Sequence, residues 1–232
     1  MEKVRSYFHR ISDIRLAIVI TLILVFVGVF LGHGFYNTVA SAPSPGFHYL
    51  LEPHNPLSYL ASWDGADYIQ IALTGYQNLF WVNWFPLYPI TIHVLNFIIP
   101  SPLVSALVIA WTSLVGAIYF YLKIARKLFN LKDVTEPLRA LLFFVLFPTS
   151  VFLIAPFAES LFAFLALGAI YFALSKRYYL ASLFALLSSA THITGVIVAI
   201  FVALIMLEEE LEWYKVVLSL AVSSLGLLSY ML

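Results

Sequence analysis

Long apolar runs constrain this chain more than any other feature of its sequence. The run LAIVITLILVFVGVFLG, residues 16–32, carries no charged side chain, and a helix needs about 20 apolar residues to cross a bilayer. The chain of 232 residues is 62% hydrophobic and only 10% charged, whereas soluble domains average about 25% charged residues. The sequence therefore predicts an all-α, polytopic integral membrane protein.

The positions of Lys and Arg orient the predicted helices. No Lys or Arg occurs between residues 16 and 122, and basic residues then cluster over 123–139 and at 176–177. Because cytoplasmic loops are enriched in Lys and Arg, these clusters and the N-terminal segment 1–15 are expected to be cytoplasmic. The charge pattern does not name the membrane, which is expected to be the plasma membrane if the source is a prokaryote and the endoplasmic reticulum if it is a eukaryote. The loop 37–101 is expected to face the outside or the lumen.

The apolar blocks and the charge pattern predict about six transmembrane helices in a single membrane domain that covers residues 1–232. The predicted spans are 16–36, 102–122, 137–155, 157–174, 179–207 and 213–232, and a cytoplasmic loop covers 123–136. The block 179–207 is longer than a bilayer requires. The motif ATHITG in its middle predicts either a break or a polar site that faces the protein interior.

The C-terminal part of this topology places the acidic segment EEELEW on the outer side. The chain then ends inside an apolar run. Such an end is expected of a fragment, or of a short form that needs a partner subunit to supply further spans.

The outer loop is predicted to carry two interfacial helices. Ser62 is expected to cap a helix over 62–74, with Gly75 at its end. Prolines bound a second helix over 86–99, which at about 21 Å is too short for a hydrocarbon core of about 30 Å. The segment LFWVNWFPLYP between them is an aromatic belt, typical of a membrane interface.

Asp64 and Asp67 stand out because no Lys or Arg lies near them in the sequence. Negative charge in a first helical turn suits the helix dipole, which is one explanation of the pair. A general base for a hydroxyl at the membrane surface is a second explanation, and a divalent cation held by hard oxygen ligands is a third. No metal site and no cofactor are assigned, and the cation stays an open alternative.

Three segments, in order, resemble the PIG-V family of mannosyltransferases, which add the second mannose of GPI anchors, and their prokaryotic relatives. WDGADYIQIALTGY followed by FPLYP resembles the first motif of that family. LFPTSVFLIAPFAESLFAFLALGAIYF resembles the second, and LASLFALLSSATHITGVIV resembles the third. The resemblance covers about residues 60–200, and it implies that further spans would be expected beyond those in this sequence.

The resemblance implies a GT-C-like helical bundle and an inverting glycosyltransferase, of mannosyltransferase type. Its donor would be a polyprenyl- or dolichyl-phosphate-linked sugar at the outer or lumenal face of the membrane, and its acceptor a glycolipid or a glycan. Asp64 matches the Asp of the family's Trp-Asp motif, so the resemblance implies that it is the catalytic base. Asp67 falls where the family pattern varies, and no role is carried onto it.

The other residues that match the family motifs are expected to contact substrate. They are Trp63, Tyr68, Tyr76, Tyr88, His93, Glu159, Ser160 and His192. Glu159 has a structural alternative, pairing within the bundle, and Tyr88 has another, shaping its turn. His93 and His192 stand where relatives carry Arg, so they would bind a phosphate only in the protonated form.

Two other functions remain as alternatives. A non-catalytic membrane subunit or scaffold of a glycosylation complex would explain the short chain and the His substitutions. A transporter would need ionisable residues in the middle of its spans, and this sequence has few. The absence of cysteine excludes disulfides and a thiol nucleophile, and no basic surface or phosphate-binding loop indicates a nucleic acid or a nucleotide-sugar as partner.

Overall fold

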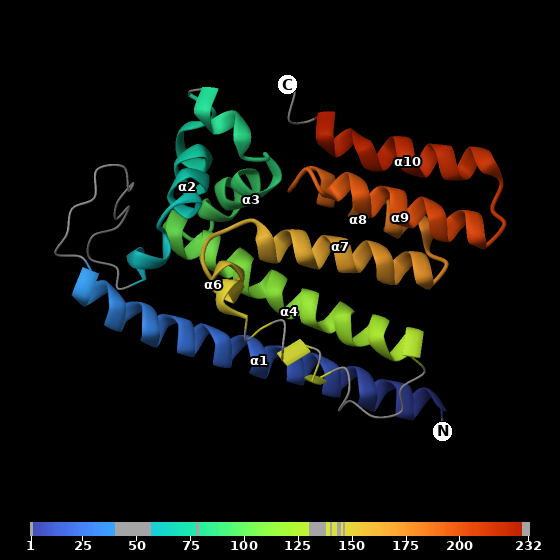
Figure 1. Cartoon of the computed structure of the whole chain (residues 1–232), viewed down its shortest axis with the longest axis horizontal. Helices are drawn as coiled ribbons and strands as arrows, with labels where there is room; N and C mark the ends of the chain where they lie inside the picture. Colours follow the sequence, from blue (N-terminus) through green and yellow to red (C-terminus); the bar gives the residue numbers. More distant parts are fainter. Residues whose placement is uncertain are drawn as a thin grey trace.

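The computed structural model describes residues 2–39, 57–77, 79–129 and 147–228, together with 138–139, 141–142 and 145. Every regular element within these ranges is helical, which confirms the predicted all-α class. Figure 1 shows the order of the main elements: α1 (Glu2–Val39), α2 (Asp64–Thr74), η2 (Leu79–Asn83), α3 (Leu87–Asn96), α4 (Pro102–Phe129), α6 (Val151–Ile154), α7 (Glu159–Leu174), α8 (Tyr178–Ser189), α9 (Gly195–Glu208) and α10 (Trp213–Leu228).

The long helices form a bundle in which sequence neighbours pack side by side. α4 packs against α7, α7 against α8, and α8 against both α9 and α10, while α1 lies along α4 (Figure 1). The short helices α2 and α3 pack on each other and on the beginning of α4, and a cluster of buried apolar side chains joins them to α7. This arrangement fixes α2 and α3 on one end of the bundle.

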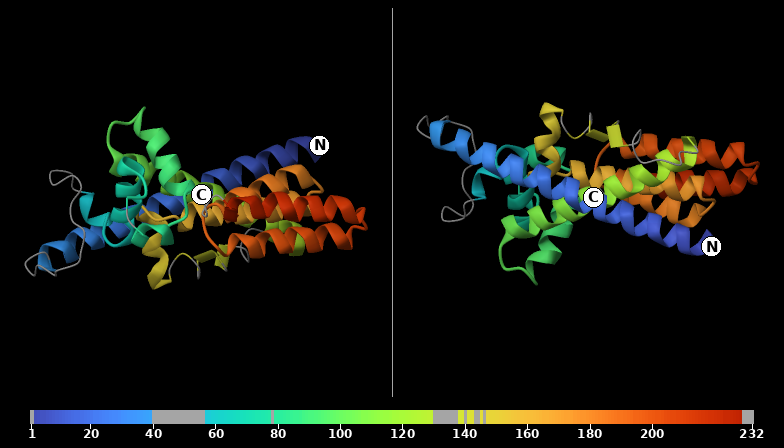
Figure 2. Two further views of the ribbon diagram at one scale, coloured as in Figure 1. Left: turned by 90° about the horizontal axis from the view of Figure 1, so that it is seen from above. Right: turned by 90° about the horizontal axis from the view of Figure 1, so that it is seen from below.

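The basic residues gather at one end of the bundle, which we call the basic end. There the buried Asp13 of α1 is paired with Lys123 at 3.1 Å and with Arg126 of α4 at 2.7 Å. The opposite end carries α2 and α3, and the two views of Figure 2 agree in placing them away from the N-terminus. We call this second end the α2–α3 end.

The expected single helix over 179–207 is wrong, because the structure has two helices there. α8 ends at the α2–α3 end, where the Leu87 amide donates to the Ala190 carbonyl. α9 then runs back to the basic end, where Glu209 pairs with Lys176. The two helices therefore form a hairpin. The alternative of a break at ATHITG is therefore confirmed. The acidic segment EEELEW consequently lies at the same end as Lys176, and its expected place on the other side is wrong.

Gly195 makes this hairpin geometrically feasible. A Cβ at position 195 would lie 2.4 Å from the carbonyl carbon of Ser188 and from the amide nitrogen of Ser189. The beginning of α9 touches the backbone that ends α8, so only a residue without a side chain fits. A hydrophobicity pattern carries no information about such a backbone contact.

The bounds of the two short helices, α2 and α3, are close to those expected. α2 begins at Asp64 and ends at Thr74, with the Gly75 amide donating to the Ile71 carbonyl, and α3 occupies 87–96 of the expected 86–99. The expected capping by Ser62 is wrong, since its hydroxyl donates to the Tyr59 carbonyl at 2.8 Å. The predicted span over 137–155 is described only in part.

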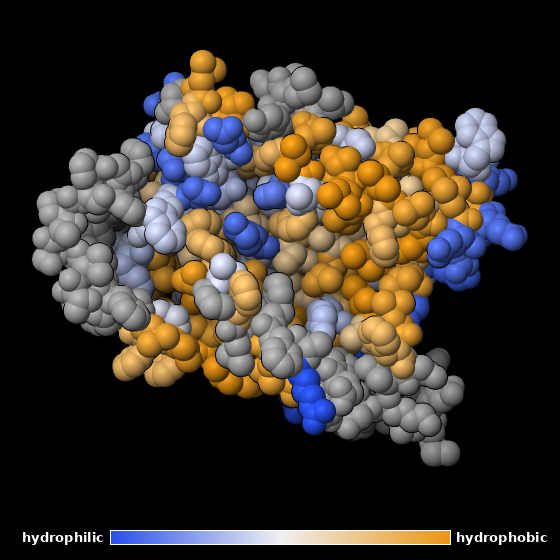
Figure 3. All heavy atoms as spheres, viewed as in Figure 1, coloured by the Kyte–Doolittle hydropathy of each residue, from blue (hydrophilic) through white to orange (hydrophobic). Residues whose placement is uncertain are grey.

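In the part of the chain that the structure describes, two helices are long and apolar enough to cross a membrane by themselves, Asp13–Leu31 within α1 and Pro102–Phe129. α7, α8, α9 and α10 are shorter apolar helices. Figure 3 shows hydrophobic side chains over the middle of the bundle and hydrophilic ones towards its two ends. Together these features are those of an all-α membrane protein.

Candidate active site

The candidate site is built around the first turn of α2, where the backbone is strained. Trp63, directly before the helix, has φ 54° and ψ −135°, a conformation that a residue with a side chain adopts only at a cost of about 1–3 kcal/mol. This turn exposes the Trp63 ring, which packs against Phe152 with ring centroids 6.3 Å apart. Asp64 follows as the first residue of α2 and is exposed to solvent.

Gly65 brings the beginning of α2 against the segment that precedes α7. A Cβ at position 65 would lie 3.0 Å from Pro156 Cγ and 3.4 Å from the Pro156 carbonyl oxygen. This close approach places Asp64 near Glu159, the first residue of α7. The first and second family-like motifs, separated by about 90 residues of sequence, therefore meet at one place.

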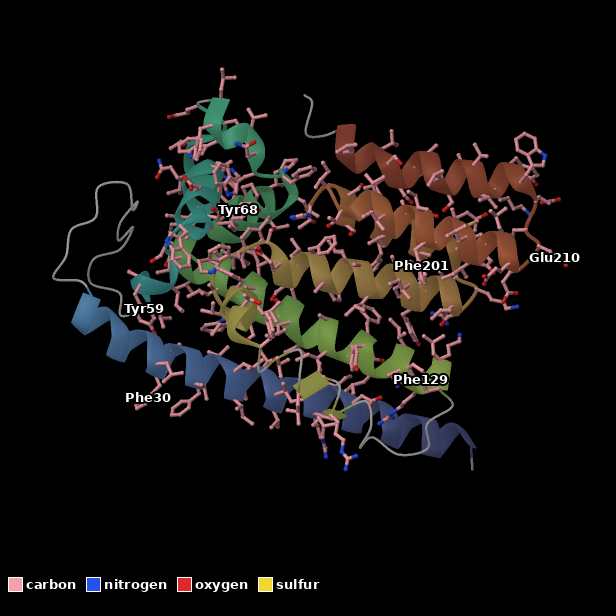
Figure 4. All side chains as sticks on the ribbon, viewed as in Figure 1. Phe30, Tyr59, Tyr68, Phe129, Phe201 and Glu210 are labelled. Carbon is pink, nitrogen blue, oxygen red and sulfur yellow. The ribbon has the colours of Figure 1, made fainter. Side chains whose placement is uncertain are left out.

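The electrostatics of Tyr68 locate both carboxylates beside it. Burial raises the pKa of the Tyr68 hydroxyl most, and the charges of Glu159 and then Asp64 raise it further. Glu159 and Asp64 also repel each other. Two acidic side chains thus share one place at the α2–α3 end, where Figure 4 labels Tyr68.

Asp64 is a carboxylate with water on one side and protein on the others. Desolvation raises its pKa above the ordinary value of 3.8, and the nearby charge of Asp67 raises it further. A hydrogen bond from the Trp84 side chain acts in the opposite direction and lowers the pKa. A carboxylate that is accessible, basic and oriented by a fixed donor has the properties of a general base.

Asp67, to which the sequence assigned no role, has a structural one. It is buried, and Trp81 Nε1 donates to its Oδ1 at 2.9 Å. Trp81 and Trp84 are three residues apart in the aromatic belt, as Asp64 and Asp67 are in α2. Trp81 bonds Asp67 and Trp84 bonds Asp64, and these two hydrogen bonds hold the aromatic belt against α2.

The expected substrate-binding tyrosines differ in accessibility. Tyr76 is partly exposed, and its hydroxyl donates to the Trp84 carbonyl at 2.7 Å. Tyr68 is buried, with its ring edge-on to Tyr88 at a centroid distance of 5.1 Å. Tyr88 is fully buried and donates to the Ala106 carbonyl at 3.0 Å. Tyr88 therefore belongs to the framework that joins α3 to α4.

Ser160 and His93 also make framework contacts. The buried Ser160 hydroxyl donates to the Leu153 carbonyl at 2.6 Å. His93 Nδ1 lies 2.7 Å from the Ala72 carbonyl, and because a carbonyl only accepts, Nδ1 is the protonated nitrogen. His93 thus ties α3 to the far end of α2, eight residues beyond Asp64 and about 12 Å along the helix.

His192 lies in the turn between α8 and α9, next to the candidate site. Its ring stacks on Phe85 at 6.4 Å and lies 5.4 Å from the Phe162 ring. Phe85 directly follows Trp84, and Phe162 is one turn beyond Glu159 on α7. The structure therefore brings the third family-like motif to the same place as the first two.

Sequence reasoning missed Trp84, Trp81 and Gly65 as parts of the site. A signal was available for the tryptophans, because their spacing of three matches the spacing of the two aspartates. No comparable signal marks Gly65, whose role depends on a contact with residue 156. Among the described residues no group of three or more His, Asp or Glu side chains comes together as a metal site would require, so Asp64 and Glu159 are the acidic groups that a cation could contact here.

The fold and the site define a class of protein, an all-α membrane protein with an acidic site at one end of its bundle. The family described as "Mannosyltransferase (PIG-V)" matches residues 14–231. The chain belongs to this family, and it is a glycosyltransferase of the mannosyltransferase type. Neither the curated proteins nor the solved structures contain a significant match to it.

Proposed function

We propose that this chain is an inverting mannosyltransferase that uses a polyprenyl- or dolichyl-phosphate-linked mannose at the outer or lumenal face of the membrane. The observation that carries the proposal is the position of Asp64. Asp64 is an accessible carboxylate with a raised pKa. It is the first residue of α2 at the α2–α3 end, beside Glu159 and the aromatic belt. Membership of the family supports the sugar and the reaction type.

In the proposed reaction the acceptor hydroxyl attacks the anomeric carbon of the donor. Its proton passes to Asp64, a bond forms between the acceptor oxygen and the anomeric carbon, and the bond from that carbon to the phosphate oxygen breaks. The electron pair of the broken bond leaves with the lipid phosphate. Attack from the face opposite the phosphate inverts the configuration at the anomeric carbon.

The protein's share of this reaction is mainly positioning. The Trp84 side chain fixes the Asp64 carboxylate by a hydrogen bond. Tyr76 in turn fixes Trp84 through its carbonyl. Glu159, the first residue of α7, lies near Asp64 and is a second polar group that can contact the sugar or the acceptor.

The test compares Asp64→Asn with Asp67→Asn. Purified chain in lipid nanodiscs is incubated with labelled polyprenyl-phosphate-mannose and a panel of glycolipid acceptors. We expect Asp64→Asn to lower kcat by about 100-fold or more, the usual contribution of a general base. Asp67→Asn keeps the oxygen that Trp81 bonds, so transfer should stay within a few-fold of wild type.

Two results would contradict the proposal. Equal transfer by wild type and Asp64→Asn would remove Asp64 as the base, and a product with the donor's own anomeric configuration in the NMR spectrum would exclude inversion. A folded wild type that transfers nothing to any acceptor would favour the alternative, a non-catalytic subunit of a glycosylation complex.

A further inference from the structure

The elements at the α2–α3 end carry no Lys or Arg to bind the phosphate that the proposed function brings there. The chain contains no Lys or Arg over residues 16–122, 140–175 or 178–214. The elements of the candidate site, from α2 and α3 to the beginning of α7 and the α8–α9 turn, all lie within these stretches. Asp64, Asp67 and Glu159 are present there, so the released lipid phosphate would meet carboxylates and no Lys or Arg from these elements.

Histidine is the remaining side chain that could carry positive charge. Of the side chains that the structure describes at this end, His93 and His192 are the two histidines. His93 is tied to the Ala72 carbonyl about two turns of α2 away from Asp64. His192 is next to the site, through its ring contacts with Phe85 and Phe162.

The hydrogen bonds of His192 define which ring nitrogen faces outward. The Thr194 amide donates to Nδ1 at 3.3 Å, and the Thr194 hydroxyl lies 2.8 Å from the same nitrogen. In the neutral ring the proton is therefore on Nε2, which makes it a donor. Because a hydroxyl accepts as well as donates, the contact with Thr194 persists when Nδ1 also takes up a proton.

We propose that His192 binds the phosphate group of the lipid donor, through Nε2–H, and becomes protonated as the phosphate binds. This inference rests on the proposed function for the identity of the ligand. The position of the residue carries it: a solvent-exposed histidine whose ring contacts Phe85, next to Trp84 of the candidate site, and Phe162, one turn beyond Glu159, in an end of the molecule whose elements lack Lys and Arg. Charge-assisted hydrogen bonds to phosphate are the strong kind.

The charged and titratable neighbours of His192 favour this linkage. Burial lowers the pKa of the free ring below 6.5, so the ring is neutral at pH 7 before a ligand binds. Phe162 of α7 and Phe85, which precedes α3, contact the ring, and the titratable groups closest to them in sequence on these helices are Glu159 and the buried Tyr88. The described parts of α8, α9 and α10 carry none at this end. An arriving phosphate adds negative charge and raises the proton affinity of the ring.

Binding of citronellyl phosphate, a short polyprenyl phosphate, tests the proposal without requiring transfer. We expect its affinity for the wild-type chain in nanodiscs to fall as the pH rises from 5.5 to 8.5, with the His192 NMR signals shifting towards the protonated form on binding. His192→Gln should bind about tenfold more weakly at pH 5.5, and its affinity should no longer fall with pH, so that only the effect of the probe's own second ionisation, at about pH 6, remains. His192→Arg should bind tightly across the whole range, because its charge is fixed.

The controls separate this proposal from its alternatives. His93→Gln, a matched histidine of the same end, should bind like wild type. Citronellol should bind without pH dependence. Inorganic phosphate should compete only weakly, and equal competition would show a site for free phosphate and overturn the assignment to a lipid. Unchanged binding by His192→Gln would overturn it as well.

The failure of this inference is distinguishable from the failure of the proposed function. Transfer that depends on Asp64 while His192→Gln keeps the wild-type KM for the donor would refute the role of His192 alone. Binding that depends on His192 in a chain that transfers no sugar would support His192 and refute the proposed reaction.

Discussion

Asp64 holds its charge in surroundings that disfavour it. Desolvation and the charge of Asp67 raise its pKa in the folded protein. The folded chain therefore keeps this proton more tightly than the unfolded chain does, so the free energy of unfolding falls as the pH rises above 3.8. The preceding residue, Trp63, adds backbone strain at the same turn. Strained and unfavourably charged residues persist where the surrounding structure fixes them, and such residues cluster at active sites.

The hydrogen bond from Trp84 should control the acid limb of the pH–rate profile. A base acts in its ionised form, so transfer should fall as the pH falls through the pKa of Asp64. Trp84→Phe removes the one side-chain interaction that lowers this pKa. We therefore expect the acid limb of kcat to move to higher pH in Trp84→Phe, measured as transfer rate against pH at saturating donor.

Trp81→Phe is the matched control for this prediction. It removes an indole N–H from the same belt, but one that bonds Asp67. Stability should fall in this variant, by about 1 kcal/mol for a lost hydrogen bond, and the acid limb should not move. If the acid limb of the pH–rate profile moved equally in both variants, the shift would come from a general disturbance of the aromatic belt, and the prediction for Trp84 would be wrong.

The candidate site could be predicted from sequence only at the residues that carry a motif. Asp64, Glu159 and His192 belong to three separate motifs, and the structure brings them together. The tryptophan that tunes Asp64 is brought to it by the way η2 folds back over α2, and the matching spacing of Trp81 and Trp84 is the one local signal of that contact. Tyr88 and Ser160 matched the motifs equally well, yet their hydroxyls donate to carbonyls inside the fold.

Among the elements, the α8–α9 hairpin depends most on a single residue. Gly195→Ala would push a Cβ to 2.4 Å from the backbone of Ser188 and Ser189, and backbone cannot rotate away as a side chain can. We expect a loss of about 1–3 kcal/mol, typical of overpacking, seen as a lower Tm in detergent. Ile200→Ala, at an exposed position of α9, should change Tm much less.

The hairpin also shows where hydrophobic pattern stops being informative. Residues 179–207 are apolar almost throughout, and composition alone indicates one long span. Two helices of 12 and 14 residues bury the same side chains and return the chain to its starting end. The polar motif ATHITG marked the break, but whether it was a turn or an interior site was decided only by contacts with α3 and with Lys176.

For the whole molecule, the contacts predict that the α9–α10 turn lies on the same side of the membrane as the α7–α8 turn. The chain contains no cysteine, so single introduced cysteines can be labelled without background. Glu208→Cys and Arg177→Cys should react with an impermeant maleimide from one side of sealed vesicles, and Leu79→Cys from the other. Figure 4 shows the two ends through its labels: Phe129 and Glu210 at one, Tyr59 and Tyr68 at the other.

Labelling of Glu208→Cys from the side of Leu79→Cys would contradict this arrangement and restore the topology expected from sequence. Arg177→Cys and Leu79→Cys, labelled in the same vesicle preparation, serve as references for the two sides, because leaky vesicles would let the reagent reach both. The expected result would also separate the acidic segment EEELEW from the candidate site.

The unequal helix lengths have a mechanical consequence for the lipid around the protein. α1 and α4 have 38 and 28 residues, whereas α10, at the opposite edge of the bundle in Figure 1, has 16 in the described part of the chain, which is about 24 Å of helix. A bilayer with a core of about 30 Å adapts to short helices by thinning. We therefore expect the protein to meet an ordinary bilayer on one flank and a thinner one on the other, where lipid headgroups would sit deeper relative to the protein than those across the bundle.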